Sequence, residues 1–356
     1  MYRMRWLKKM FLFCGVFVLL MILLIFGFVI HAKIVYQNFY NTADRQFKIP
    51  DIHSGFTPQG VDYLPDEDQF LISGYAGDQT AKIYLIRSQA EIAGEFFSRK
   101  ISILDTNGDN FINHAGGVCA SEKYIFLAGC DGMCYILNRD ILEDDTVNSS
   151  PIIGSFEAYN NADFCYIQNN RLYVGEYYNS LKYKTEKSHH MTTPSGDKNK
   201  AIITVFGLSE TDTGALDPAA DNQKFGVSDI PVAVFSITDA VQGMCITGDE
   251  IVLSSSALFS SSELYFYDYQ KIYENQNDFF SLNGANIPLY YLDSGNLNKI
   301  IYIPPKSEGL IYYDNKISIV FESAANKYLL GKWIGGEYVY CFDVLETMNS
   351  LISDMP

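Results

Sequence analysis

The segment Pro58-Gln59-Gly60-Val61-Asp62 recurs in related form four more times along the chain. The related segments are Ala115-Gly116-Gly117-Val118-Cys119, Asn161-Ala162-Asp163-Phe164-Cys165, Val241-Gln242-Gly243-Met244-Cys245 and Ser307-Glu308-Gly309-Leu310-Ile311. Their third position is glycine in every case except Asp163. Glycine suits a position where the backbone has a positive φ or lies very close to another chain segment. We interpret the segment as the start of a structural unit that is repeated five times.

Each start is followed by further runs rich in β-branched and aromatic residues, which are typical of strands. The second runs are 70–74, 124–129, 171–176, 250–255 and 316–322. The third runs are 81–87, 133–139, 201–207, 263–269 and 337–343. The fourth runs are 100–104, 151–156, 231–237 and 299–303. The fifth unit has no fourth run of its own, and residues 45–49 can supply it from the other end of the folded part.

Four strands repeated around a ring, closed by both ends of the chain, predict an all-β fold of the β-propeller type. Closure removes the exposed sheet edges that an open arrangement would leave. We therefore expect a five-bladed propeller over residues 45–344. A count of six stays open if the long third unit holds an additional blade, and an irregular β-sandwich is the simpler alternative. Residues 345–356 are expected as a C-terminal tail.

A membrane segment precedes the repeats. Residues 10–30 are 21 in number, mostly apolar and without a charge, and about 20 such residues span a bilayer as a helix. The basic tail 1–9 holds Arg3, Arg5, Lys8 and Lys9, so the positive-inside rule predicts a cytoplasmic N-terminus. We expect a single-pass signal-anchor in the cell membrane, a stalk over 31–44 and an extracellular C-terminal domain. A cleaved signal peptide is the alternative, but its apolar region is usually shorter.

The charge of the chain bears on its partners. It has 42 acidic and 26 basic residues, a formal net charge of −16, and no acid before Asp44. A surface this acidic argues against nucleic acid, which needs clustered Lys and Arg. The sequence gives no indication of the oligomeric state.

The topology of a propeller predicts where a site would form. Loops from the fourth strand to the next first strand share one face with loops from the second strand to the third. Residues that enter the inner strands therefore surround one end of the central channel, which we call the mouth. This ring contains Gln59, His114, Asn161, Asp163, Gln242 and Glu308, and the ends of second strands add Glu176 and Glu322. The simpler interpretation is that these groups only satisfy backbone ends around a water-filled channel.

Three functions remain open for such a mouth. The first is a binding module for a small molecule, glycan or peptide, with Gln59, Asn161, Glu176, Gln242, Glu322 and Trp333 as candidate ligand-binding residues. The second is a metal-assisted or acid–base enzyme, with Glu308, His114 and Asp163 as catalytic candidates. The third is a cell-surface scaffold. Because like charges in a partly dry concavity recruit cations, we expect Asp163 and Glu308 to favour a divalent metal such as calcium, an amine or a cationic peptide.

The loop 177–200 carries adjacent histidines, His189 and His190, among Lys, Ser and Thr residues. Neighbouring side chains in an extended segment point apart, which argues against a shared metal. We expect a solvated, flexible loop here.

The segments Phe56-Thr57-Pro58-Gln59-Gly60 and Ser307-Glu308-Gly309 resemble the inner-strand starts of five-bladed propellers such as the plant-type glutaminyl cyclases. The resemblance implies a propeller fold and covers only these strand starts. Those cyclases are rich in Trp around their active site, whereas Trp333 is the single Trp beyond the membrane segment. The WD-type propeller signature does not occur in the sequence.

Overall fold

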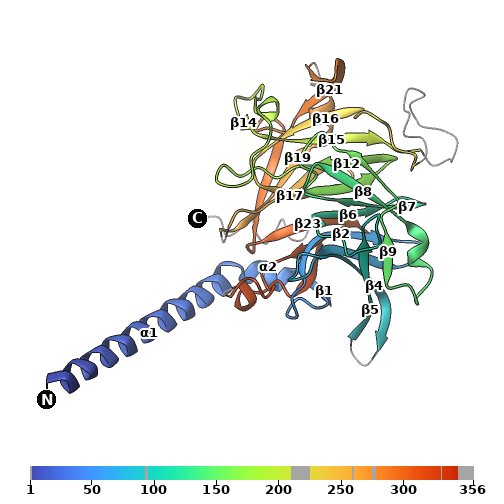
Figure 1. The fold of residues 1–356 in the computed structure, drawn as a ribbon. Helices are drawn as coiled ribbons and strands as arrows, with labels where there is room; N and C mark the ends of the chain where they lie inside the picture. Colours follow the sequence, from blue (N-terminus) through green and yellow to red (C-terminus); the bar gives the residue numbers. More distant parts are fainter. Residues whose placement is uncertain are drawn as a thin grey trace.

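The computed structural model describes residues 2–92, 95–209, 225–258, 260–274, 278–329 and 331–343. A long helix, α1 (Tyr2–Val35), leads into a short helix, α2 (Gln37–Thr42), and then into a ring of β-sheets. Figure 1 shows α1 projecting away from this ring. The predicted tail 345–356 lies outside the described residues.

The strands form five sheets that are the blades of a β-propeller, which confirms the predicted fold. Blade 1 contains β2 (Thr57–Leu64), β3 (Gln69–Tyr75), β4 (Ala81–Ile92), β5 (Glu95–Leu104) and β9 (Ser149–Pro151). Blade 2 contains β6 (Gly117–Ala120), β7 (Tyr124–Ala128), β8 (Met133–Asn138) and β10 (Gly154–Glu157). Blade 4 contains β17 (Val241–Ile246), β18 (Glu250–Ser255), β19 (Ser262–Asp268) and β22 (Leu297–Ile303). A further two-stranded sheet, β13 (Met191–Thr192) with β14 (Lys198–Asn199), lies in a loop.

Blade 5 is closed by both ends of the folded part, as predicted. It contains β23 (Ser307–Tyr313), β24 (Lys316–Phe321) and β25 (Tyr338–Asp343). The strand β1 (Asp44–Lys48) pairs antiparallel with β25, with Asp44 opposite Cys341. The N-terminal strand therefore completes the C-terminal blade, and the ring has no open seam there.

Blade 3 is larger than predicted, and the described residues of the third unit form no sixth blade. It contains β11 (Phe164–Gln168), β12 (Arg171–Gly175), β15 (Ala201–Gly207) and β16 (Ala233–Ile237). Two more strands, β20 (Asp278–Leu282) and β21 (Ala285–Tyr291), extend its outer edge. They form a hairpin that follows the helix α3 (Tyr269–Glu274), within the chain segment of blade 4, and β21 pairs parallel with β16. The chain segment of blade 4 thus contributes a hairpin to the sheet of blade 3.

The recurrent glycines lie where the inner strands of neighbouring blades almost touch. A Cβ on Gly117 would stand 2.4 Å from the backbone nitrogen of Cys165, and one on Gly60 would stand 2.6 Å from that of Val118. Neither glycine is among those with a positive φ. Close backbone approach around the narrow centre of the ring is therefore the reason that these positions are glycine.

The structure corrects the repeat alignment in the third unit by one residue. Gly117 pairs with Ala128 at the end of β7, and the residue that pairs equivalently at the end of β12 is Phe164, opposite Gly175. Asp163 therefore does not hold the glycine position. Asp163 instead directly precedes the glycine position, as Gln59, Gln242 and Glu308 directly precede their glycines.

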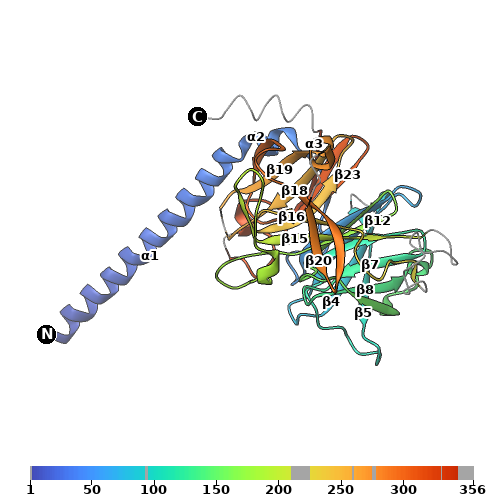
Figure 2. The ribbon, with the colours of Figure 1, turned by 90° about the horizontal axis from the view of Figure 1, so that it is seen from above.

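Residues 31–44, expected as a stalk, are largely helical and pack against the propeller. The Phe39 side chain is 1 % exposed and lies against the rings of Phe321, Tyr340 and Phe342. The Tyr40 hydroxyl donates to the backbone oxygen of Ile334 at 2.8 Å. Figure 2 shows α2 beside the propeller while α1 extends away from it. The N-terminal helices are thus fixed to blade 5 rather than connected by a free segment.

Candidate functional site at the propeller mouth

Two carboxyl groups of blade 5, from Glu308 and Glu322, lie together at the mouth. Glu308 enters the inner strand β23, and Glu322 follows the end of β24, so the hairpin topology brings them to the same face. Their residues are 2 % and 4 % exposed. The two side chains are close enough to share a hydrogen bond. The sequence prediction that these two acids come together is consistent with this arrangement.

Glu322 is surrounded by cationic and hydroxyl side chains. Its Oε2 lies 2.8 Å from Nζ of Lys327, and its Oε1 lies 3.2 Å from Nζ of Lys306. The Tyr328 hydroxyl donates to Oε1 at 2.5 Å. Burial alone would raise the pKa of Glu322, but the two ammonium groups outweigh it and lower that pKa. Glu322 is therefore the ionised member of the carboxyl pair.

Glu308 is the carboxyl of the pair that has the raised pKa. Burial raises its pKa well above the usual range, and the neighbouring Glu322 carboxylate raises it further. Two carboxyl groups this close cannot both be charged without a large electrostatic cost. When Glu308 is protonated, it can donate a hydrogen bond to the Glu322 carboxylate.

Two glutamines from neighbouring blades complete the polar ring around this pair. Nε2 of Gln59 donates to Oε2 of Glu322 at 3.3 Å, and Nε2 of Gln242 donates to Oε1 of Glu308 at 3.2 Å. Both glutamines directly precede one of the recurrent glycines of the inner strands, as Glu308 does. The ring thus brings predicted residues from blades 1, 4 and 5 into one hydrogen-bonded group.

Aromatic rings flank this group. The Tyr75 ring stacks on the imidazole of His114, with centroids 4.6 Å apart and planes 15° apart. The Lys327 ammonium lies 5.0 Å from the Tyr75 ring centroid and 4.7 Å from that of Tyr328. Burial lowers the pKa of His114, and the nearby charges of Lys327 and Lys182 lower it further. His114 is therefore a neutral, stacked ring at neutral pH.

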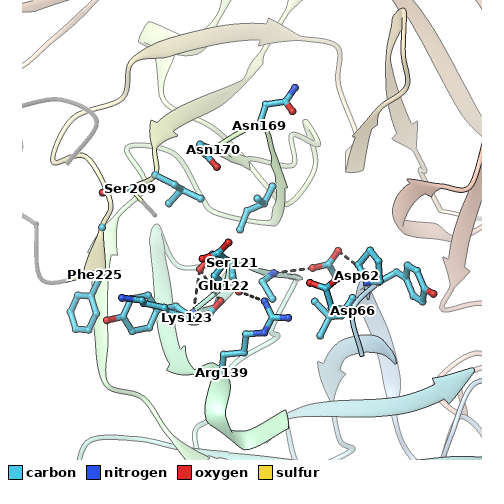
Figure 3. A pocket seen from close by; sticks show the side chains of 18 residues that line it. Asp62, Asp66, Ser121, Glu122, Lys123, Arg139, Asn169, Asn170, Ser209 and Phe225 are labelled. Atoms are coloured by element: carbon cyan, nitrogen blue, oxygen red, sulfur yellow. Dashed lines mark hydrogen bonds between the residues drawn. The ribbon is translucent and has the colours of Figure 1, made fainter. Parts of the chain in front are cut away.

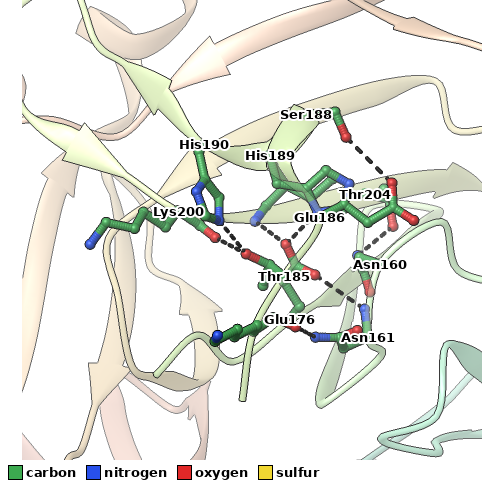
Figure 4. Close-up of polar contacts among 12 residues, drawn as sticks. Asn160, Asn161, Glu176, Thr185, Glu186, Ser188, His189, His190, Lys200 and Thr204 are labelled. Atoms are coloured by element: carbon green, nitrogen blue, oxygen red, sulfur yellow. Dashed lines mark hydrogen bonds and ion pairs between the residues drawn. The ribbon is translucent and has the colours of Figure 1, made fainter. Parts of the chain in front are cut away.

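The predicted ligand residues Glu176 and Asn161 belong to a separate cluster (Figure 4). Oε1 of Glu176 lies 2.7 Å from Nδ1 of His189 and accepts a hydrogen bond from the backbone nitrogen of Ile202 at 3.1 Å. Its Oε2 accepts from the backbone nitrogen of Asn161 at 3.2 Å. Glu176 is 1 % exposed and His189 is 3 % exposed. This cluster fixes a long loop to the body of blade 3.

The expectation of a solvated loop around the two histidines is wrong for His189. Its imidazole is buried beside Glu176, and its centroid lies 5.9 Å from that of the Phe280 ring, which belongs to the hairpin of β20 and β21. His190 instead contacts the ring of Tyr178 at 5.4 Å. The two neighbouring side chains do point to different partners, as the extended backbone predicts. A distant hairpin buries His189, and no local sequence signal shows this.

Asp163 lies in a third environment. Its Oδ2 accepts a hydrogen bond from the backbone nitrogen of Tyr177 at 2.7 Å, and its side chain contacts the thiol of Cys130. Burial raises the pKa of Asp163 to about 7, although these hydrogen bonds oppose the shift. Gly116 leaves the space for this thiol, since a Cβ there would stand 2.5 Å from Sγ of Cys130.

The predicted metal site stays a prediction. Among the residues that the structure describes, no group of three or more His, Cys, Asp or Glu side chains is placed to hold a metal ion. Asp163 and Glu308 each have the neighbours given above rather than each other. Trp333 ends the short 3₁₀ helix Gly331–Trp333, and its side chain lies outside what the structure describes.

The opposite face of the propeller holds a cavity of about 340 Å³ between blades 1, 2 and 3 (Figure 3). Asp62 lines it, and its Oδ2 accepts from the backbone nitrogen of Ala120 at 2.8 Å. Burial raises the pKa of Asp62 to about 7. Arg139 is held by the backbone oxygen of Ser121 and by the carboxylate of Glu67. The polar groups of this cavity therefore mostly form hydrogen bonds and ion pairs within the protein.

Sequence reasoning missed Lys306, Lys327 and Tyr75 at the mouth. Lys306 directly precedes the repeat start of blade 5 and has a positive φ of 67°, as the equivalent residue Ala240 does at 61°. Lys327 and Tyr328 lie in the long loop 323–336, whose conformation was not predictable from sequence. The same loop supplies Ile334 to the contact with α2, so it links the mouth to the N-terminal helices.

These features define the chain as a five-bladed β-propeller with an N-terminal helix, Lys8–Val35, that is long and apolar enough to span a membrane. Comparison with solved structures finds the glutaminyl cyclase of Myxococcus xanthus, with 9 % identity, 84 % of this chain and 93 % of that chain covered, and a TM-score of 0.40. The WD40 propeller of Doa1 is similar at 9 % identity, with 85 % and 97 % covered and a TM-score of 0.40. No family model and no curated protein matches. These similarities concern the fold alone.

Proposed function

We propose that this chain is a membrane-anchored propeller that binds an acidic glycan at its mouth, on the extracellular side. The observation that carries the proposal is the buried pair of Glu308 and Glu322 in hydrogen-bond contact, with the side chains of Lys306 and Lys327 beside Glu322. Buried ionisable groups with shifted pKa values gather at functional sites more often than elsewhere. In two other blades the position of Glu308 is occupied by Gln, so the ring does not require an acid there.

The charges of the described mouth group favour an anionic ligand over the cation expected from sequence. Glu322 contributes one negative charge, Lys306 and Lys327 contribute two positive charges, and Glu308 and His114 are neutral. The local sum is about +1 for these five groups, by simple counting of their charged forms. Lys327 can turn from Glu322 to a ligand carboxylate because its side chain is 36 % exposed.

The remaining groups fit the hydroxyls and ring faces of a sugar. Gln59, Gln242 and Glu308 supply donors and acceptors, while the half-buried His114 ring, stacked on the buried ring of Tyr75, supplies a flat face. Sites of this kind combine aromatic surfaces with a few well-placed polar groups.

An array of neutral, acidic and basic glycans tests the proposal, with the full chain in a non-ionic detergent. We expect retention of acidic glycans, and weaker retention by Lys327→Gln, because a charge-assisted hydrogen bond is lost. The matched control is Lys316→Gln, which removes an exposed lysine whose nearest acid is Asp44 at 3.6 Å. Preferential retention of basic ligands, or equal retention by both variants, would show that the proposal is wrong.

The carboxyl pair also favours a second candidate, an acid–base enzyme in which Glu308 donates a proton and Glu322 accepts one. Glycosidases usually separate their two carboxyl groups by about 5–10 Å, whereas these two are in contact. Binding is therefore the better-supported function. Release of sugar products from retained glycans, abolished by Glu308→Gln, would instead establish the enzyme.

A further inference from the structure

A cavity of about 460 Å³ lies where the N-terminal helices meet blade 5. It is lined by the end of α1, by α2, by β1 and β25, and by the loop before β25. Its cationic lining residues are Lys33, Arg45 and Lys332, and its single acidic lining residue is Glu337. In a chain with a formal net charge of −16, this concentration of positive charge is unusual. Figure 1 shows the junction near the labels α2 and β1.

One side of the helical segment faces this cavity. Lys33, Gln37 and Asn41 are spaced four residues apart, which places them on one face despite the turn at Tyr36. Tyr40 lines the same cavity and is fixed by its hydrogen bond to Ile334. The polar groups of the helices are therefore held in a defined position relative to blade 5.

Lys33 and Arg45 have no ion pair with Glu337, the acid in the cavity, among the described residues. Within the described part of the chain, neither Lys33 nor Arg45 forms an ion pair, and Glu337 instead approaches Lys48 at 3.4 Å and His53 at 3.3 Å. The Arg45 guanidinium lies over the ring of Tyr338, 5.0 Å from its centroid. Such stacking orients a guanidinium and leaves its N–H groups directed outward in its plane.

The position along the chain places this cavity at the level of lipid headgroups if α1 spans the bilayer. The uncharged segment ends at Ile30, and Lys33 follows about 4.5 Å further along a helix that rises 1.5 Å per residue. The headgroup layer on each side of the hydrocarbon core is about 5–8 Å thick. Lys33 therefore enters the layer in which lipid phosphates lie.

We infer that this cavity binds the phosphate headgroup of an anionic glycerophospholipid. The phosphodiester accepts hydrogen bonds from Lys33 and Arg45, and the amide groups of Gln37 and Asn41 face the glycerol part of the headgroup. Lys332 adds positive charge to the rim. The bound lipid holds the propeller in one orientation on the membrane. This inference rests on the anchor part of the proposed function and is independent of the mouth ligand.

Calorimetric titration of the full chain in a non-ionic detergent tests the inference. The probes are dihexanoyl phosphatidylglycerol, dihexanoyl phosphatidylcholine and inorganic phosphate. We expect phosphatidylglycerol to bind most tightly, and the double variant Lys33→Gln/Arg45→Gln to weaken it by about fivefold for each charge removed. Lys33→Gln alone changes an exposed helix residue and keeps the test valid if the double variant does not fold.

The matched control is Lys271→Gln/Lys316→Gln, which removes two exposed charges away from the cavity. We expect it to bind phosphatidylglycerol like the unmodified protein. Equal weakening in the control and the cavity variant, or no weakening in either, would overturn the site. Equal binding of inorganic phosphate and phosphatidylglycerol would overturn the lipid as its ligand. Unchanged glycan retention in the cavity variant would separate this result from the function of the mouth.

Discussion

Glu176 and Glu322 are both buried glutamates at the end of a second strand, yet their environments differ in kind. Glu176 accepts hydrogen bonds from the backbone nitrogens of Asn161 and Ile202 and contacts His189. Within the described part of the chain, the carboxylate of Glu322 has side-chain partners instead: Lys306, Lys327, Tyr328, Gln59 and Glu308. Backbone donors cannot leave without unfolding the loop, whereas side chains can rotate. We therefore propose that the first carboxylate maintains the structure and that the second exchanges partners with the proposed ligand.

The largest effect is expected for the structural carboxylate. Glu176→Ala leaves His189 and two backbone N–H groups buried without their partner. Breaking a buried pair in this way typically costs about 3–5 kcal/mol of unfolding free energy. Urea denaturation of the full chain in detergent measures it. A loss below about 1 kcal/mol would show that the loop 177–200 does not depend on this cluster, and Glu176 would then not differ from Glu322 in its structural role.

A smaller loss is expected for the mouth carboxylate. Glu322→Gln retains the shape of the side chain, and Lys327, whose side chain is 36 % exposed, can turn toward water. We expect a loss of about 1–3 kcal/mol, typical of a hydrogen bond to a charged group. The same urea titration compares the two variants directly. If Glu322→Gln were the more destabilising change, the mouth would be the structural cluster.

The pH dependence of stability sharpens the assignment of the raised pKa to Glu308. The pKa of Glu308 is raised in the folded protein, so its contribution is present below its unfolded pKa of about 4.5 and is lost as the pH rises through the folded value. Glu308→Gln imitates the protonated form, and its stability should fall less as the pH rises above the unfolded pKa of the glutamate. Urea midpoints at several pH values measure this. Parallel curves for both proteins would contradict a protonated Glu308.

The architecture was predictable because each blade repeats a local pattern. The glycine starts and the following strand runs predict five blades and the closing strand, and β1 pairs with β25 as expected. The hairpin of β20 and β21 was not predictable, because its pairing with β16 depends on contacts between different units. The same hairpin buries His189, which the sequence places in a polar loop.

The candidate site was predictable only in part. Gln59, Gln242 and Glu308 follow from the repeat, and the topology brings Glu322 to the same face. Lys306 and Lys327 were not predicted at the mouth, and their positions depend on a backbone with positive φ at Lys306 and on the long loop 323–336. Short-range patterns predict which face a strand start occupies, but they do not predict which loop side chains fold back onto it.

The most direct test of the mouth as the binding site is a calorimetric titration of the retained acidic glycan against three forms of the full chain. These are the unmodified protein, Glu322→Gln and Asp62→Asn, the last of which changes a buried carboxyl of raised pKa on the opposite face. We predict that Glu322→Gln weakens the affinity at least tenfold, as expected when a charged partner that positions Lys327 is lost, and that Asp62→Asn leaves it unchanged. Equal affinity of all three forms, or a loss in Asp62→Asn alone, would contradict the assignment of the mouth.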